Sequence, residues 1–278
     1  HFRSFKKKKF ISNFGDEKIH QNFVDITKKL KVINQSYKNI ELIMIDDGSR
    51  DETAVVIEKL LPRCEERFTN VIFRSRENIG VVKTLNEAIS LANGEFIATM
   101  PSDDSYEPNA IEDLAGILIN NSDYVLAVGD NLIMNDDSAL CYWDKKRRNV
   151  SDRSTASYQT FGDYLDKSRR DIDFDSESFG SYASLLKGNY IPNGYLMRSS
   201  VLKLFSYSEE SPIEDHNLVL QFAKHGKMKY LRTPTYRYRW HESNLIKSLG
   251  GLKEQLLTNL MMEQEYCTQH EDLKLIWL

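Results

Sequence analysis

Cysteine is scarce in this chain, which holds only Cys64, Cys141 and Cys267 among its 278 residues. An odd and scattered set without metal-ligand spacing argues against a disulfide framework and indicates the reduced thiols of a cytoplasmic protein. Long apolar runs are also missing, so no membrane-spanning helix is predicted. A basic excess is absent as well: the net charge is −4 and the isoelectric point about 5.9, which argues against a nucleic-acid-binding protein.

The size of the chain suits one large α/β domain with an appendage, since 278 residues can bury a full core. No signal peptide is visible, and His1 in place of an initiating Met indicates a trimmed chain or a fragment. The basic run Lys6–Lys9 has two readings, a solvated segment or a peripheral contact with the inner face of the plasma membrane. The apolar end Leu273–Leu278 can pack on the domain or on another chain, so a homo-oligomer stays open.

Two carboxylates follow the first strongly apolar strand. Leu42–Ile45 is a continuous apolar run, as expected for a strand covered on both faces, and it leads directly into Asp46 and Asp47. Gly48 permits a tight turn, and the residues after it can cap a helix. Acids at the carboxyl end of a parallel strand suit the ribose and base of a nucleotide, because those groups need hydrogen-bond acceptors. An ordinary helix cap is the alternative.

A second acid pair repeats this arrangement. The apolar segment Phe96–Met100 is followed by Asp103 and Asp104. Carboxylate oxygens are suitable ligands for Mg²⁺ or Mn²⁺, which can bridge the phosphates of a nucleotide. Alone, this pair is more typical of a turn, but two strand-end pairs favour one shared nucleotide pocket.

Four ordered stretches of the chain resemble the family 2 inverting glycosyltransferases, which have the GT-A fold. They cover about residues 30–245, and the ordered set is far more specific than any single stretch. The stretches are Asn34–Leu42 leading into Asp46-Asp47-Gly48-Ser49; Glu77–Val81 with Thr84–Ile89 and Ala92–Glu95; Ser102-Asp103-Asp104; and Glu214-Asp215-His216 with Tyr238–Asn244.

The resemblance implies a GT-A (Rossmann-like) α/β fold, with a mixed, mostly parallel sheet flanked by helices, an irregular acceptor-side region and a C-terminal helix. We expect a GT-A domain over residues 1–245, followed by a C-terminal helical extension over residues 246–278. Within the domain, about residues 1–130 form the nucleotide-binding half and about 131–245 the acceptor-binding and catalytic half. The polar segment Asp136–Lys187 shows no long apolar period and is either an acceptor-binding loop or a solvated excursion.

Apolar periodicity places the individual elements. We expect strands over residues 10–14, 41–45, 70–74, 95–100, 124–129 and 236–240, and helices over 18–33, 52–67, 82–91, 108–120 and 217–225. Residues 250–278 read mainly as helix. An apolar stripe there favours packing on the core, and it consists of Leu252, Leu256, Leu257, Leu260 and Met261.

By resemblance, the site holds a nucleotide sugar, a divalent cation (Mn²⁺ or Mg²⁺) and an acceptor. The expected nucleotide-sugar contacts are Phe14, Asp46, Asp47, Asn78, Gly80, Lys83, Ser102, Asp103, Arg239 and Ser243. The expected metal ligands are Asp103, Asp104 and His241, and the expected acceptor contacts are Asn193, Gly194 and Tyr195.

The resemblance also implies a general base. Asp215 is expected to take the proton from the acceptor hydroxyl, with Glu214 in a supporting role. The alternative is that these acids simply stabilise the N-terminus of the helix that follows them.

Two departures from the family pattern bear on the donor site. Pro101 stands where an Asp usually begins the Asp-X-Asp-Asp element, which puts the usual ribose contact in doubt. The opening strand lacks the expected Pro-X-Tyr-Asn ending, and Phe14 is the nearest aromatic that could stack on the base.

The predicted function is therefore metal-dependent, inverting transfer of a hexosyl or N-acetylhexosaminyl group from a nucleotide sugar, most simply a UDP-sugar. The expected acceptor is a glycan or lipid-linked glycan, in the synthesis of a bacterial surface polysaccharide. One alternative is a catalytically inactive module that binds sugar nucleotides, which Pro101 favours. A nucleotidyltransferase is the other, but it leaves Asp215 and His241 without roles.

Overall fold

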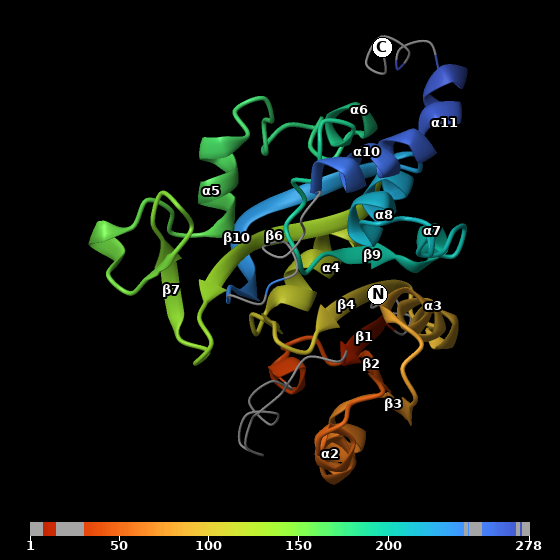
Figure 1. The fold of residues 1–278 in the computed structure, drawn as a ribbon. Helices are drawn as coiled ribbons and strands as arrows, with labels where there is room; N and C mark the ends of the chain where they lie inside the picture. Colours follow the sequence, from red (N-terminus) through yellow and green to blue (C-terminus); the bar gives the residue numbers. More distant parts are fainter. Residues whose placement is uncertain (1–7, 15–30, 242–243, 245–251, 271–272, 274–278) are drawn as a thin grey trace.

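The computed structural model describes residues 8–14, 31–241, 244, 252–270 and 273. Its centre is a mixed sheet whose strands lie in the order β3-β2-β1-β4-β9-β6-β10-β5 (Figure 1). The strands are β1 (Lys8–Phe14), β2 (Ile40–Asp47), β3 (Asn70–Arg76), β4 (Phe96–Pro101), β5 (Ser105–Tyr106), β6 (Tyr124–Met134), β7 (Leu140–Trp143), β8 (Asn149–Val150), β9 (Leu196–Arg198) and β10 (Lys227–Arg239).

The helices flank this sheet. They are α2 (Thr53–Arg67), α3 (Val81–Leu91), α4 (Ala110–Asn120), α5 (Phe161–Ser168), α6 (Tyr182–Leu185), α7 (Ser199–Leu202), α8 (Glu214–Ala223), α10 (Leu252–Met262) and α11 (Gln264–Gln269). Short 3₁₀ helices cover Lys31–Asn34 and Arg153–Thr155. None of the helices in the described ranges combines the length and apolar composition needed to cross a bilayer.

The parallel strands β3, β2, β1 and β4 form the first part of the sheet. Every residue of β2 is buried, as its continuous apolar sequence predicts. Successive side chains of a strand point to opposite faces. Leu42 and Met44 accordingly join the cluster that contains α2 and α4, whereas Ile43 and Ile45 join the cluster that contains α3 and α8.

The second part of the sheet is held together by long-range pairing. β9 runs antiparallel between β4 and β6, and β10 runs parallel to β6 over most of its length. β5 then pairs with the far end of β10. Because β5 follows Asp104 directly, this pairing brings Asp103 and Asp104 beside Arg239 and His241, about 135 residues later in the chain.

The predicted strands and helices of residues 40–134 are confirmed within a few residues, apart from β6, which extends to Met134. β10 is also far longer than the predicted strand 236–240, since it follows β6 from Lys227 onward. The predicted helix over residues 18–33 lies largely outside the described residues.

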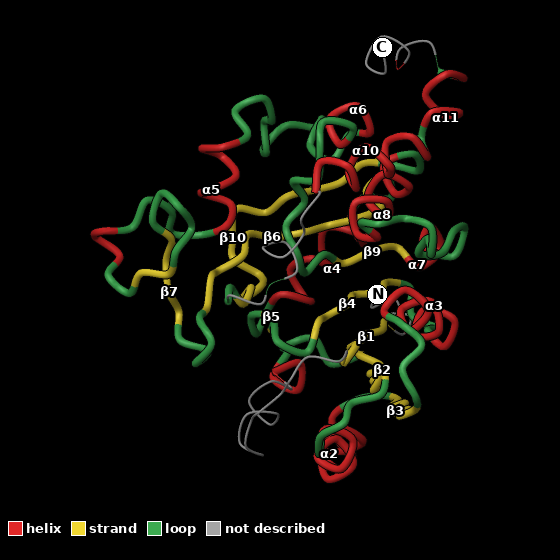
Figure 2. Tube along the Cα trace, viewed as in Figure 1, coloured by secondary structure: helices red, strands yellow, loops and turns green. Residues whose placement is uncertain are grey.

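The prediction that residues 136–187 are irregular needs correction. Figure 2 shows loops there, but also the hairpin β7–β8 and the helices α5 and α6. α5 begins at a side-chain cap, since Thr160 accepts a hydrogen bond from the Asp163 N–H at 3.0 Å. Its Leu165 enters the main core. A helix of eight residues is too short to show a clear apolar period, so the pattern missed it.

The predicted apolar stripe of the C-terminal helix is confirmed only in part. Leu260 packs against the main core, but Leu257 is 49 % exposed and Met261 is 67 % exposed. Two polar side chains are buried instead, Asn259 in α10 and Glu263 between α10 and α11. Polar groups of residues 182–224 bind them, so they are buried with hydrogen-bond partners.

Candidate active site

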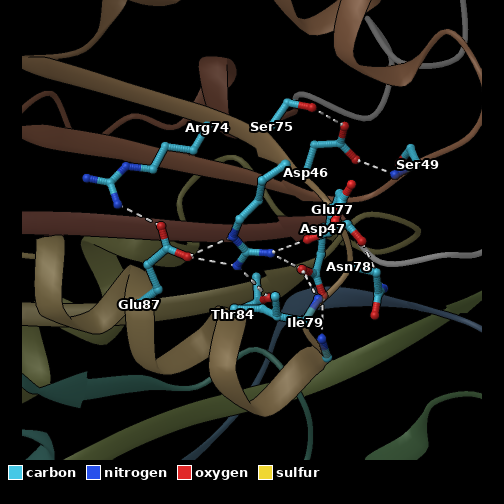
Figure 3. A network of polar contacts seen from close by, with 12 residues as sticks. Asp46, Asp47, Ser49, Arg74, Ser75, Glu77, Asn78, Ile79, Thr84 and Glu87 are labelled. Atoms are coloured by element: carbon cyan, nitrogen blue, oxygen red, sulfur yellow. Dashed lines mark hydrogen bonds and ion pairs between the residues drawn. The ribbon is translucent and has the colours of Figure 1, made fainter.

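The acid pair at the end of β2 is buried and fully engaged by protein groups (Figure 3). Asp46 accepts hydrogen bonds from the Ser49 N–H at 3.1 Å and from Ser75 Oγ at 2.8 Å. Asp47 accepts from the N–H groups of Ile79 and Gly80 at 3.1 and 3.0 Å and forms an ion pair with Arg76. Their predicted contacts with base and ribose stay a prediction.

Electrostatics fix Asp47 as a carboxylate. Burial alone would raise the pKa of Asp47, but the Ile79 N–H and the Arg76 guanidinium hold that pKa below its usual value. Arg76 is itself held by Glu87, with Nη2 at 2.7 Å from Oε2, and by Thr84 Oγ1 at 2.9 Å. The network thus ties the end of β2 to the start of α3.

The loop between β3 and α3 is built on this network. The Asn78 side chain donates to the Asp47 carbonyl at 2.8 Å, and Gly80 has a φ of 96°, which favours glycine. A Cβ on Gly48 would come within 2.6 Å of the Asn78 N, so the turn also requires glycine there. The exposed Lys83 forms an ion pair with Glu209 at 3.6 Å. The Phe14 side chain and Ser243 lie outside the described residues.

The acid pair after β4 divides into two environments. Asp104 is 2 % exposed and accepts hydrogen bonds from Tyr236 Oη at 3.0 Å and the Arg239 N–H at 2.8 Å. Burial, together with the neighbouring Asp103 charge, raises the pKa of Asp104 well above its usual value. Asp103 instead has its Oδ2 at 3.4 Å from Nε2 of His241. Ser102, before the pair, is buried.

Arg239 anchors loops through its guanidinium. The side chain donates to the carbonyls of Asp103, Asn135 and Asp136 at 2.8, 2.6 and 2.8 Å, and to Ser138 Oγ at 2.7 Å. Arg239 is buried, and its guanidinium donates to these protein oxygens. It therefore holds the backbone of Asp103 in place. The predicted contact with a donor phosphate is not tested by these bonds.

The three predicted metal ligands do not meet as one cluster. No group of three His, Cys, Asp or Glu side chains with metal-site geometry occurs in the described part of the chain. Asp104 accepts hydrogen bonds from Tyr236 and Arg239, and its predicted role as a metal ligand stays a prediction. Asp103 and His241 do face each other. A carboxylate oxygen with an imidazole nitrogen is a donor set that suits Mn²⁺ when a diphosphate and water supply the other ligands.

Glu214 and Asp215 open α8. Asp215 accepts a hydrogen bond from the His216 N–H at 2.7 Å. Burial raises the pKa of Asp215, and burial with the adjacent Asp215 charge raises the pKa of Glu214. A carboxylate with a raised pKa is a stronger proton acceptor than an ordinary Asp, as a general base requires.

The C-terminal helices hold the start of α8. Asn259 is 0 % exposed; it accepts from Ser211 Oγ and donates to the Ile213 carbonyl, both at 2.8 Å. One turn later, Glu263 accepts from Tyr182 Oη and forms an ion pair with Lys224 at 2.6 Å. Residues 252–270 therefore pack against α6 and the two ends of α8, and α10 fixes the backbone just before Asp215.

The predicted acceptor turn is positioned by close packing. The Asn131 carboxamide, oriented by its hydrogen bonds, donates to the Asn193 carbonyl at 3.0 Å and accepts from its N–H at 3.1 Å. Gly194 has a φ of 80°, and a Cβ there would lie 2.3 Å from the Tyr236 ring. Tyr195 is buried.

One cavity of about 660 Å³ joins these parts. Asp103 lies on its wall with Glu214 and Asp215, together with Asn193. Asp46 and Asp47 are not among its lining residues. Aromatic and basic side chains complete the wall, including Phe161, Tyr164, Tyr190, Tyr238, Trp240, Arg147 and Arg169. Rings of this kind suit the apolar faces of sugars.

Two residues of the site were not predicted from the sequence, Arg76 and Asn131. Arg76 ends β3 immediately before the Glu77–Gly80 stretch, so the signal was a basic residue beside a predicted nucleotide loop. Asn131 lies on β6 beyond the predicted end of that strand. The basic cluster Lys145–Arg148 has two readings from sequence, a contact with an anionic acceptor or, preferably, a solvated face, and of its four residues only Arg147 lines the cavity.

A family model, glycosyl transferase family 2, matches residues 25–173, more than half of the chain. The chain belongs to glycosyl transferase family 2. This confirms the predicted family. Among the similar proteins is EpsH of Bacillus subtilis (strain 168), which is named as a glycosyltransferase. It is 26 % identical over 224 residues, which cover 77 % of this chain and 56 % of EpsH.

Solved structures show the fold of this family 2 chain. S. aureus TarS residues 1–349 in complex with UDP matches with a TM-score of 0.58 at 18 % identity, over 84 % of this chain and 61 % of that one. Mannosyltransferase PcManGT from Pyrobaculum calidifontis, in complex with GDP-Man and Mn²⁺, matches with a TM-score of 0.57 at 12 % identity. That match covers 85 % of this chain and 57 % of PcManGT. The predicted GT-A fold is confirmed, and the chain spans less than two thirds of each of these proteins.

Proposed function

We propose that this family 2 protein is a metal-dependent, inverting glycosyltransferase that moves a sugar from a UDP-sugar to a glycan or lipid-linked glycan. The synthesis of a bacterial surface polysaccharide is the proposed setting. The observation that carries the proposal is the shared cavity. Asp103 and Asp215 both line it, and Asp103 faces His241. UDP in the TarS complex supports the choice of donor.

Asp215 is the proposed general base. It accepts the proton of an acceptor hydroxyl while that oxygen forms a bond to the anomeric carbon of the donor sugar. The bond from that carbon to the diphosphate oxygen breaks on the opposite face, and its electron pair leaves with the diphosphate, so the configuration inverts. Glu214 supports the start of α8, and Asn193–Tyr195 shape the acceptor side.

Asp103 and His241 would hold the divalent cation. The cation supplies charge neutralisation for the leaving diphosphate when it is bound. Asp104 contributes indirectly: through Tyr236 and the Arg239 backbone it fixes the turn that presents Asp103. The network of Asp46, Asp47 and Arg76 orders the loop before α3, because Asp47 accepts hydrogen bonds from the N–H groups of Ile79 and Gly80.

The direct test is UDP release from UDP-glucose and UDP-N-acetylglucosamine in the presence of Mn²⁺. We expect release by the unaltered protein and a loss of about 100-fold or more in Asp215→Asn. Glu66→Gln, an exposed acid on α2, is the matched control and should retain the rate. Equal release by Asp215→Asn and the control would refute the assigned base.

Pro101 favours one rival function, since it lines the cavity where the family usually has an acid. An inactive binding module predicts tight UDP binding with no release of UDP from any donor and acceptor pair. A nucleotidyltransferase predicts diphosphate release from UTP and a sugar 1-phosphate. The same protein sample can be assayed for all three outcomes.

A further inference from the structure

The hairpin between β7 and β8 separates its basic residues. Asp144 accepts hydrogen bonds from the N–H groups of Lys146 and Arg148 at 2.8 and 2.9 Å, which fixes the turn. Lys145, Lys146 and Arg148 are exposed, and the side chain of Arg148 forms an ion pair with Asp144 at 2.6 Å. Arg147 alone among these cations lines the cavity.

Arg147 adopts a strained backbone conformation. Its φ is 58°, in the left-handed region that residues with a Cβ occupy at a cost in free energy. Glycine or asparagine would occupy this position more easily. The Trp240 indole donates to the Arg147 carbonyl at 2.7 Å, so the strained residue is fixed to the segment that leads to His241. Strain held in this way at a cavity wall indicates a functional constraint.

The Arg147 guanidinium lies against two aromatic rings but has no anionic partner among the described residues. It lies 5.1 Å from the Tyr164 ring centre and 5.2 Å from that of Trp240. The other cavity-lining arginine, Arg169, forms an ion pair with Asp171 at 3.0 Å. No ion pair or side-chain hydrogen bond of Arg147 occurs in the part of the chain that the structure describes. Its five N–H donors are therefore available to a ligand in the cavity.

We propose that Arg147 binds a phosphate or carboxylate group of the acceptor, so that the acceptor is an anionic saccharide. This rests on the proposed transferase function, because it assigns one wall of the same cavity to the acceptor. A guanidinium presents paired N–H donors that match the oxygens of either anion. The flanking rings of Tyr164 and Trp240 can meanwhile contact the sugar to which the anion is attached.

The acceptor, and not the donor diphosphate, is the occupant that the placement favours. Arg147 and Tyr164 come from the β7–β8 hairpin and α5, which lie together away from β1, β2 and β3 (Figure 1). The acid pairs that we assign to the donor follow the parallel strands β2 and β4. Arg147 lies on the wall away from those strands, but its contact with Trp240 places it beside the residue that precedes His241 in sequence, so its effect on UDP binding is measured in the same test.

The test compares three sugars that differ in charge. Glucose 1-phosphate, glucuronic acid and methyl glucoside are titrated calorimetrically into the full chain saturated with UDP and Mn²⁺, so that UDP occupies the nucleotide and diphosphate positions of the donor. We expect one of the two anionic sugars to bind about tenfold or more tightly than methyl glucoside, as a charge-assisted hydrogen bond contributes. The tighter of the two identifies phosphate or carboxylate as the group.

Variants of one hairpin provide the controls. Arg147→Gln should abolish the preference for the anionic sugar, and Arg147→Lys should retain part of that preference. Arg148→Gln removes the same charge one residue away and should leave the preference unchanged. The proposal is overturned if the unaltered protein shows no preference, if Arg147→Gln retains it, or if Arg147→Gln weakens UDP binding instead. These titrations need no turnover, so a failure of UDP release would count against the transferase function and not against the anion site.

Discussion

The two strand-end acid pairs look alike in sequence but differ in what surrounds them. After β2, both carboxylates are buried, and Asp46 and Asp47 are satisfied by N–H groups, a hydroxyl and Arg76. After β4, only Asp104 is satisfied in this way, whereas Asp103 lies on the cavity wall opposite His241. Similar acid pairs therefore differ in environment: the pair after β2 is enclosed by the loop that it holds, whereas the pair after β4 lines the cavity.

The largest expected effect is on Asp103. Asp103→Asn removes the carboxylate that faces His241, and we expect the rate of UDP release at saturating donor to fall about 100-fold or more, with a weaker response to added Mn²⁺. The free energy of unfolding should change by less than about 0.5 kcal/mol, because the contact of Asp103 with His241 Nε2 is long, at 3.4 Å. Urea unfolding and a UDP-release assay measure the two effects. An Asp103→Asn variant that keeps both its stability and its full rate of UDP release would contradict the different roles of the two acid pairs.

Asp47 should show the opposite behaviour. Asp47→Asn places an amide NH₂ among groups that are all donors, namely Arg76 and the N–H groups of Ile79 and Gly80. We expect a loss of about 2 kcal/mol in the free energy of unfolding, the cost of leaving charged and buried donors without an acceptor. Equilibrium urea unfolding at pH 7 measures it, with Asp51→Asn on the exposed turn as a control. A loss no larger than that of the control would contradict the structural role.

The contribution of Asp47 should also depend on pH. Because the folded protein holds the pKa of Asp47 below its unfolded value, the carboxylate stabilises the fold above the unfolded pKa. That stabilisation is lost as the pH falls toward the lowered pKa of the folded state. The difference in unfolding free energy between the unaltered protein and Asp47→Asn should therefore stay nearly constant from pH 7 to about pH 5 and shrink as the pH falls below the unfolded pKa of about 4. A difference that grew on acidification would have the wrong sign.

The smallest expected effects come from single hydroxyl groups bound to the two pairs. Ser75→Ala removes one hydrogen bond to Asp46, and Tyr236→Phe removes one to Asp104. Each should cost about 1 kcal/mol of unfolding free energy. Only Tyr236→Phe should also slow UDP release, because Asp104 helps to hold the turn that presents Asp103. Thermal unfolding and steady-state kinetics of the two variants show whether this asymmetry is real.

Much of the fold could be predicted from local sequence. The buried strand Leu42–Ile45, the glycine turn at Gly48 and the helix after it all follow from apolar runs and turn chemistry, and the structure confirms them. The same reasoning failed for α5, which is too short for a period, and for part of α10, where Leu257 and Met261 are exposed and Asn259 is buried. In both cases, the deciding contacts come from residues remote in the chain.

The candidate site divides in the same way. The sequence determined which acids follow strands and helix starts, and its ordered motifs identified the family, because these features are written in neighbouring residues. Only the tertiary structure decided that Asp104 is held by Tyr236 and Arg239, that Asp103 faces His241, and that Arg147 turns into the cavity. The partners of Asp104 come from more than 100 residues later in the chain, so local sequence does not show that they bind it. The orientation of Arg147 depends on a turn with a positive φ, which the sequence pattern does not reveal either.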